Sequence, residues 1–199
     1  MYFLLKRYSD ILLSLIALLI LFPLFIIIYL LILTFYGNPV FYKQERVGKN
    51  WENFYLYKFR TMRKQTGYEG VGITCLDDAR ITRFGAILRK YKLDELPQLI
   101  NVLAGNMSLV GPRPELPKFA MVYRNEYDQI LKMKPGISDF ASIKYRNENN
   151  LLRTNKDPEK YYLQNILPDK INLYKKYLSE ASTATDFKII LSTLKSMFK

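Results

Sequence analysis

The sequence predicts an α+β protein that is mainly helical and is held to a membrane by its N-terminal segment. Residues 11–35 are almost wholly apolar, two short segments rich in aromatic and β-branched residues follow, and most of the remaining chain has helical periodicity. We therefore expect a membrane-inserted segment at 1–38. A single domain at 39–199 should follow, with a small β-hairpin and amphipathic helices suited to a membrane surface.

The apolar run is long enough to cross a membrane, but a proline divides it. As one helix, residues 11–35 would measure about 37 Å against a hydrocarbon core of about 30 Å. Pro23 lies at the centre of the run and favours a kink or break there. Lys6 and Arg7 precede the run and further basic residues follow it, so the positive-inside rule chooses no orientation. A re-entrant helix-break-helix, with both ends cytoplasmic, fits these features better than a kinked span, which stays open as the alternative.

The two strand-like segments are Val40–Val47 and Phe54–Phe59, separated by Gly48–Asn50. Their composition and the intervening glycine predict a β-hairpin. Basic residues, including Lys58 and Arg60, alternate with aromatic ones here. That mixture suits either nucleic-acid binding or a membrane-facing hairpin, and the apolar anchor favours the hairpin.

Residues 63–80 are polar and contain glycines, which indicates a loop. Asp77 and Asp78 near its end are better explained as helix caps than as metal ligands. Phe84–Lys92 has the pattern of a short amphipathic helix with a basic face, and it leads directly to Asp94.

The stretch from Leu93 to Pro114 carries the most distinctive chemistry. Asp94 has the position of a helix N-cap, Pro97 suits the first helical turn and Gly105 suits the C-terminal stop. The apolar face that we expect to be buried consists of Leu96, Leu99, Ile100 and Leu103.

Adjacent carboxylates at Asp94 and Glu95 stand where backbone N–H groups and the helix dipole also favour a phosphate. The prolines in Gly111–Pro114 should hold the Arg113 guanidinium in a fixed direction. The alternative is that Asp94 is merely a cap and Arg113 merely a surface charge.

The C-terminal half gives three further predictions. Lys134–Gly136 has the proline and glycine of a type II turn. The chain from 157 onward is helical in pattern. An apolar stripe near the end fits either core packing or a helix in the membrane plane, and it consists of Phe187, Ile190, Leu191, Leu194 and Phe198.

The overall composition restricts the chemistry. The formal net charge of +12 indicates an anionic partner: nucleic acid, acidic lipid or a phosphorylated substrate. The absence of histidine excludes Ser-His-Asp and Cys-His catalysis and imidazole bases. The single Cys75 excludes an internal disulfide and a cysteine-cluster zinc site, and it suits a buried structural thiol. Catalysis would rest on carboxylates, Lys, Arg, Tyr, Ser or a hard metal such as Mg²⁺.

Several motifs cover nearly the whole chain, and together they resemble the small monotopic bacterial phosphoglycosyl transferases, which start polyprenol-linked glycan assembly. The Leu-Asp-Glu-Leu-Pro-Gln and Gly-Pro-Arg-Pro blocks are the specific ones at this spacing. The residues that carry the resemblance are the apolar segment broken by Pro23, Tyr57–Met62, Asp78–Arg80, Phe84–Gly85, Arg89, Leu93–Gln98, Asn101–Gly105 and Met107–Pro114.

The resemblance implies transfer of a sugar-1-phosphate from a UDP-sugar to polyprenyl phosphate, with release of UMP, on the cytoplasmic face of the bacterial inner membrane. Asp94 matches the nucleophile that forms an aspartyl phospho-sugar, and Glu95 matches its dyad partner. Mg²⁺ is the implied cofactor, with both carboxylates as candidate ligands. The implied partners are the UDP-sugar, polyprenyl phosphate and membrane lipids, and no nucleic acid; a homo-oligomer is left open.

Four basic residues are our candidates for contacts with phosphate or phospho-sugar: Lys58, Arg60, Arg89 and Arg113. The residue chemistry agrees with the implied reaction, because a chain without histidine has a carboxylate as its plausible covalent catalyst. Attack by a carboxylate on an anion also requires charge screening from a metal and from arginines.

The chain departs from the family pattern in two places. Phe22 stands before the membrane proline, where the family commonly has serine. The segment Lys134–Ser142 also differs from the usual motif, so the resemblance implies no particular sugar, and the polyprenol and final glycan stay open as well.

Two other classes of function compete with the enzyme. One is a non-catalytic, membrane-anchored protein that binds a nucleotide-sugar or anionic lipid. The other is a basic nucleic-acid-binding protein, which the apolar anchor and the lack of a recognised nucleic-acid motif argue against.

Overall fold

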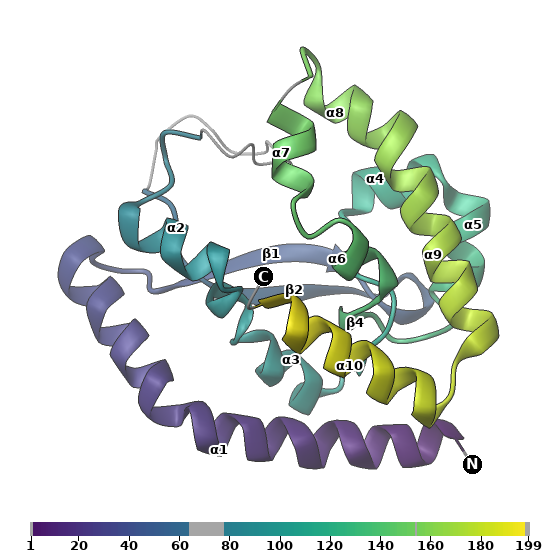
Figure 1. Ribbon diagram of the computed structural model, residues 1–199, viewed down its shortest axis with the longest axis horizontal. Helices are drawn as coiled ribbons and strands as arrows, with labels where there is room; N and C mark the ends of the chain where they lie inside the picture. Colours follow the sequence, from purple (N-terminus) through teal and green to yellow (C-terminus); the bar gives the residue numbers. More distant parts are fainter. Residues whose placement is uncertain (1, 64–77, 154, 198–199) are drawn as a thin grey trace.

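The computed structural model describes residues 2–63, 78–153 and 155–197. One long helix, α1 (Tyr2–Tyr36), runs along a domain of short helices and small β-ladders (Figure 1). The other helices are α2 (Arg83–Lys90), α3 (Gln98–Ala104), α4 (Pro117–Val122), α5 (Arg124–Ile130), α6 (Phe140–Lys144), α7 (Glu148–Arg153), α8 (Pro158–Tyr161), α9 (Leu167–Glu180) and α10 (Thr183–Met197). Single turns of other helix types lie at Lys49–Trp51 and Leu93–Glu95 (3₁₀) and at Tyr162–Ile166 (π).

Helix α1 continues through Pro23. In place of two helices separated by a break, the structure has one helix that changes direction about midway along its length (Figure 1). Its length and apolar composition are sufficient to cross a membrane. Most of its large apolar side chains are exposed, because only one narrow side of the helix faces the domain.

Both ends of α1 are bonded to the same domain. Near the N-terminus, Lys6 Nζ donates to Asp186 of α10 at 2.7 Å. At the C-terminus, Arg60 Nη2 donates to the carbonyl oxygens of Tyr36 and Gly37 at 2.5 and 2.6 Å. The helix is therefore attached along the domain rather than extending away from it.

The predicted hairpin is confirmed to within one residue at each strand start. Strand β1 (Phe41–Val47) pairs antiparallel with β2 (Asn53–Phe59), with Phe41 opposite Phe59 and Val47 opposite Asn53. The connecting 3₁₀ turn contains two residues in the left-handed region, Asn50 at φ 55° and Trp51 at φ 66°. The hairpin places Lys58 next to the last residue of β2, beside the dyad segment.

A second ladder replaces the predicted type II turn. Strand β3 (Ser108–Val110) pairs in parallel with β4 (Gly136–Ser138). A type II turn would give Gly136 a positive φ, which among the described glycines occurs at Gly37 and Gly105. The prediction was wrong because Gly136 lies against Gly111, where an added Cβ would come within 2.1 Å of the Gly111 nitrogen. The glycine serves close backbone approach rather than a turn.

The C-terminal chain is helical, as predicted. Its largest buried cluster lies among α5, α6 and α9 and includes Tyr127, Leu167 and Tyr174. In α10 the residue that packs inward is Ile189, whereas three members of the predicted stripe are exposed: Phe187, Leu191 and Leu194. Core packing is therefore the wrong interpretation for these three; Ile190 is partly buried, and Phe198 lies outside the described residues.

The segment before α2 corrects a capping prediction. Thr82 is the N-cap of α2, and its hydroxyl accepts from the Gly85 nitrogen at 2.9 Å. Asp78 instead accepts from the Arg80 backbone at 3.0 Å and pairs with the Arg80 guanidinium. The predictions for Cys75 and Asp77 lie outside the described residues.

Candidate active site

The adjacent carboxylates lie in the 3₁₀ turn Leu93–Glu95, ahead of α3. Lys92 enters the turn in the left-handed conformation, at φ 56°, and α3 begins at Gln98 after Pro97. The Asp94 side chain therefore does not cap the helix as predicted, because the helix starts later. Gly105 ends α3 at φ 89°, which confirms the predicted stop.

The packing of α3 covers a different set of side chains from the one predicted. Leu99 is buried as expected, but Ile100 is 42% exposed, contrary to the prediction. Asn101 and Val102 are buried in its place, since α3 packs between α1 and β2. Leu96 and Leu103 are partly buried.

Glu95 is surrounded by two basic side chains from distant parts of the chain. Arg113 donates from Nη1 to Oε2 at 3.2 Å and from Nη2 to Oε1, which makes a bidentate ion pair. Lys58 donates to the same Oε1 at 2.9 Å. Burial alone would raise the pKa of Glu95, but Arg113 and Lys58 hold that pKa well below its usual value.

Asp94 is buried without an equivalent partner. Its Oδ1 has no hydrogen-bond partner among the residues that the structure describes. Burial raises the pKa of Asp94, and the positive charge of Lys58 opposes that rise. The two neighbouring carboxylates therefore differ: Glu95 is ionised and fully paired, while Asp94 presents an oxygen that no described residue contacts through a hydrogen bond.

The pKa values of the two basic residues paired with Glu95 are also shifted. Burial lowers the pKa of Lys58, against the influence of Glu95. The Glu95 carboxylate raises the pKa of Arg113. Both side chains keep part of their surface exposed beside the dyad, so they can meet an anionic ligand as well as Glu95.

Arg89 approaches the dyad from α2. Its Nε donates to Thr61 Oγ1 at 2.8 Å, which fixes the guanidinium. Burial lowers the pKa of Arg89, and the charge of Asp94 is the largest influence in the other direction. Arg89 is thus an electrostatic neighbour of Asp94.

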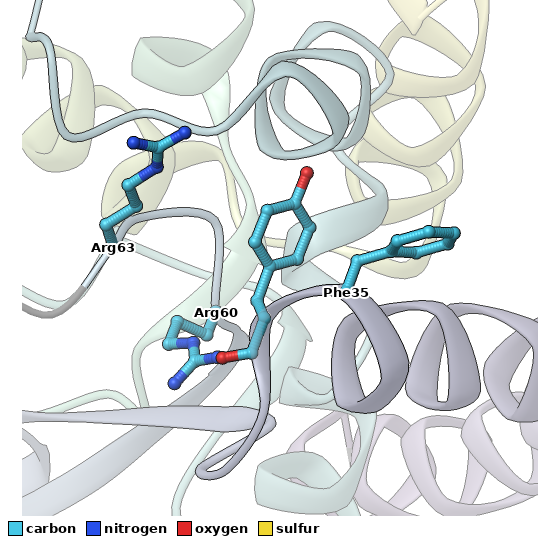
Figure 2. A pocket seen from close by; sticks show the side chains of 4 residues that line it. Phe35, Arg60 and Arg63 are labelled. Atoms are coloured by element: carbon cyan, nitrogen blue, oxygen red, sulfur yellow. The ribbon is translucent and has the colours of Figure 1, made fainter.

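Arg60 lies elsewhere, although it is two residues from Lys58. It bonds the C-terminal carbonyls of α1 and lines a pocket of about 340 Å³ with Phe35, Tyr36 and Arg63 (Figure 2). Neither dyad carboxylate lines that pocket. The structure therefore brings Lys58, Arg89 and Arg113 to the dyad and places Arg60 at the end of α1.

Two residues that the structure places near the site were not among the candidate site residues, although the first, Asn101, belongs to a motif that carries the family resemblance. The Asn101 amide accepts from the Tyr57 nitrogen at 3.1 Å and donates to the Tyr55 carbonyl at 2.8 Å, which joins α3 to the strand that leads to Lys58. Its signal in the sequence was a polar residue in an apolar helix.

The other is Asp139, in the segment Lys134–Ser142 that departs from the family pattern. Its carboxylate is fully buried and accepts from the Ser142 nitrogen at 2.6 Å. Burial raises the pKa of Asp139, and the nearby Arg113 charge opposes the rise. This segment therefore contributes a carboxylate behind Arg113, which no local pattern indicates.

The oxygen chemistry of the dyad bears on Mg²⁺, which usually binds proteins through one or two carboxylates together with waters and substrate phosphates. The Asp94 carboxylate fits that role, because no described residue donates to its Oδ1 and one of its two oxygens can bind a metal while the other stays available. Both Glu95 oxygens already accept from Arg113. Within the described residues no group of three or more His, Cys, Asp or Glu side chains could hold a metal alone. The site suits a metal shared with a phosphorylated ligand, with Asp94 as the protein ligand.

Comparison with known proteins gives a consistent result. A family model described as bacterial sugar transferase matches residues 1–199. A UDP-glucose:undecaprenyl-phosphate glucose-1-phosphate transferase from Xanthomonas campestris pv. campestris is 41% identical over 81% of this chain and 34% of its own length. The Escherichia coli (strain K12) protein of the same name is 34% identical over 96% of this chain and 39% of its length.

An exopolysaccharide production protein, PSS, from Rhizobium leguminosarum bv. phaseoli is 46% identical over 70% of this chain and 74% of its own length. The chain thus spans little more than a third of the two glucose-1-phosphate transferases and about three-quarters of the shorter relative.

Proposed function

Because the chain belongs to the bacterial sugar transferase family, we propose that it transfers a sugar-1-phosphate from a UDP-sugar to polyprenyl phosphate, releasing UMP and initiating the assembly of a surface glycan. The observation that carries this proposal is the pairing at the dyad: Glu95 holds Arg113 and Lys58, while Asp94 keeps a buried oxygen without a partner among the described residues. The names of the relatives, which specify UDP-sugars and undecaprenyl phosphate, support the same substrates.

The reaction proceeds in two displacements. An Asp94 carboxylate oxygen attacks the sugar-proximal phosphorus of the donor, and the bond between the two phosphates breaks, so that UMP leaves with the bonding electrons. An acyl phosphate now joins Asp94 to the phospho-sugar. A phosphate oxygen of polyprenyl phosphate attacks the same phosphorus, which frees the Asp94 carboxylate and gives polyprenyl-diphosphate-sugar.

The surrounding cations make attack by an anion on an anion feasible. Arg113 and Lys58 stand beside the dyad and can spread the charge that develops on the phosphate oxygens. Glu95 keeps the guanidinium of Arg113 in one orientation before the donor arrives, so little reorganisation accompanies the reaction. Arg89 adds a third positive charge near Asp94.

Mg²⁺ is part of the proposal. When bound, the ion would neutralise charge on the donor phosphates and the departing UMP. Asp94 would hold it through the carboxylate oxygen that does not attack, while Glu95 stays bound to its cations.

We also propose that residues 1–38 insert into the cytoplasmic side of the inner membrane and that domain 39–199 lies on that face. The contacts at both ends of α1 support this placement, because a helix held to one domain at both ends cannot leave that domain across a bilayer. The exposed stripe Phe187, Leu191 and Leu194 of α10 would lie in the membrane plane.

The deciding experiment incubates the detergent-solubilised protein with polyprenyl phosphate, Mg²⁺ and a panel of UDP-sugars, and measures UMP. We expect release of UMP with at least one donor. When polyprenyl phosphate is omitted, release should stop after one turnover. Binding of a UDP-sugar without release of UMP would instead establish the non-catalytic binding protein.

A further inference from the structure

Helix α1 contains a single acidic residue, Asp10, in an otherwise largely apolar sequence. The side chain is not at the membrane-exposed surface of the helix, since Asp10 is only 6% exposed. A carboxylate buried in this position requires compensating hydrogen bonds, because burying an unpaired charge is costly. Its partners lie in the strand that precedes Arg113.

Asp10 accepts hydrogen bonds from two consecutive residues of β3. Ser108 Oγ donates to Oδ2 at 2.7 Å, and the Leu109 nitrogen donates to Oδ1 at 3.2 Å. The other edge of β3 is paired with β4, where the Ser108 nitrogen donates to the Pro135 carbonyl. Asp10 therefore supplies the acceptor that a neighbouring strand would supply on the open edge.

The chain from β3 to Arg113 is stiff, so its position follows that of the strand. The Gly111 nitrogen donates to the Ser138 carbonyl at 3.0 Å, and the Gly136 nitrogen donates to the Pro112 carbonyl at 2.9 Å. Proline stands on each side of Arg113 and fixes its own φ. A displacement of β3 would therefore also displace the Arg113 guanidinium, because the segment between the two is too stiff to compensate.

The residue one turn earlier on α1 performs a parallel task for the dyad. Arg7 donates from Nη1 to the Val102 carbonyl at 2.7 Å and from Nη2 to the Leu103 carbonyl at 3.1 Å. These carbonyls are at the C-terminal end of α3, the helix that follows Asp94 and Glu95. One stretch of α1 therefore contacts both segments that meet in the Glu95–Arg113 ion pair.

We propose that Asp10 is a positioning residue for Arg113: by holding the free edge of β3, it sets the guanidinium in register with Glu95 and with the donor phosphates. Arg7 fixes the opposite side of the same ion pair. The inference rests on the proposed phosphoglycosyl transfer for its kinetic consequence. Its structural consequence, a β3 segment held by α1, is independent of that function.

The test is Asp10→Ala, measured in detergent for UMP release and by hydrogen–deuterium exchange. We expect kcat to fall about 10- to 100-fold, because a displacement of about 1 Å in a positioning group costs up to about 100-fold. Amide exchange in residues 108–113 should become faster. Asp10→Asn should keep kcat within about threefold of the wild-type value, because the amide oxygen can still accept from the Leu109 nitrogen.

Repeating the measurement in the Arg113→Lys variant distinguishes a positioning role of Asp10 from a general effect on stability. In Arg113→Lys, adding Asp10→Ala should cost less than about threefold, since the guanidinium that Asp10 positions is already gone. Equal losses on both backgrounds would show a merely structural role and overturn the proposal. So would wild-type kcat and wild-type exchange in Asp10→Ala.

The matched control is Lys6→Gln, which removes another buried contact from the same part of α1 but one that leads to Asp186 of α10. We expect it to leave kcat and the exchange of residues 108–113 at wild-type values. If Asp10→Ala does not fold, Ser108→Ala removes one of the two hydrogen bonds; a loss of about 3- to 10-fold that vanishes in Arg113→Lys supports the proposal, and no loss overturns it.

The two proposals can fail separately. A wild-type protein that releases no UMP with any donor contradicts the transferase function. Faster exchange at 108–113 in Asp10→Ala, but not in Lys6→Gln, would still establish that Asp10 holds β3. UMP release with unchanged exchange and kcat in Asp10→Ala would leave the function intact and remove the role of Asp10.

Discussion

Arg113 engages both carboxylate oxygens of Glu95, from a turn eighteen positions further along the chain. Lys58 shares one of those oxygens. The pairing gives two adjacent acidic residues different tasks, because Glu95 has its acceptors occupied while Asp94 keeps an oxygen without a described partner. The dyad therefore combines a set of cations oriented by Glu95 with a second, buried carboxylate whose Oδ1 accepts from none of the described residues.

The first prediction concerns Asp94 as the nucleophile. Asp94→Asn should abolish UMP release and leave the thermal unfolding temperature near that of the wild type, because the side chain does not cap α3 and its Oδ1 accepts from none of the described residues. Intact-mass analysis of the wild type with donor alone should show a phospho-sugar adduct, which the variant lacks. Near-normal turnover in Asp94→Asn would remove Asp94 from the mechanism.

The second prediction concerns the geometry of Arg113. Arg113→Lys keeps the charge but loses the bidentate pairing with Glu95, so kcat/KM should fall about 10- to 100-fold. The measurement is steady-state UMP release at saturating polyprenyl phosphate. A value equal to that of the wild type would show that charge alone suffices at this position.

The third prediction concerns pH. The proposed nucleophile must be ionised, and burial raises the pKa of Asp94, so activity should fall on the acid side at a higher pH than an ordinary aspartate would give. Lys58 opposes that rise, and Lys58→Met should therefore move the acid limb of kcat/KM to still higher pH. Arg60→Lys is the control, and we expect it to leave the acid limb of kcat/KM at the wild-type pH. A shift toward lower pH in Lys58→Met would contradict this arrangement.

The fourth prediction separates Arg60 from the substrate contacts. Its hydrogen bonds to Tyr36 and Gly37 hold the end of α1, so Arg60→Gln should lower the free energy of unfolding by about 1.5–3 kcal/mol. The KM for the UDP-sugar should stay within about twofold of the wild type. A KM raised tenfold or more at unchanged thermal stability would restore Arg60 as a phosphate contact.

The fifth prediction concerns the membrane topology. Pro23→Ala should straighten α1 into a helix of about 52 Å, long enough to span, so that some molecules place their N-terminus outside. A cysteine at the exposed position 3, in a Cys75→Ser background, can be labelled with an impermeant reagent on spheroplasts. We expect protection with Pro23 present and partial labelling after Pro23→Ala. Labelling with Pro23 present would show that α1 spans the membrane.

Local features of the sequence were sufficient to predict an apolar helical segment at the N-terminus, though not its continuity through Pro23, and also the hairpin, the helical C-terminus and the helix stop at Gly105. Each depends on neighbours in the chain: hydrophobic length, β-branched composition, periodicity, or a glycine that accepts a positive φ. Asp94, Glu95 and Arg113 were also found in this way, through motifs whose residues lie within one short stretch.

The tertiary structure decided which charges meet. Lys58 and Arg113 reach Glu95 from separate strands and turns, and Arg60, two residues from Lys58, bonds the end of α1 instead. The same holds for Gly136, where a close backbone contact with Gly111 replaced the turn that its neighbours suggested. Asp10 finds its hydrogen-bond donors, Ser108 and Leu109, in a strand about a hundred positions away. Local propensities act over a few residues, whereas ion pairs and close contacts form between segments that folding brings together, and no pattern in one segment specifies its partner.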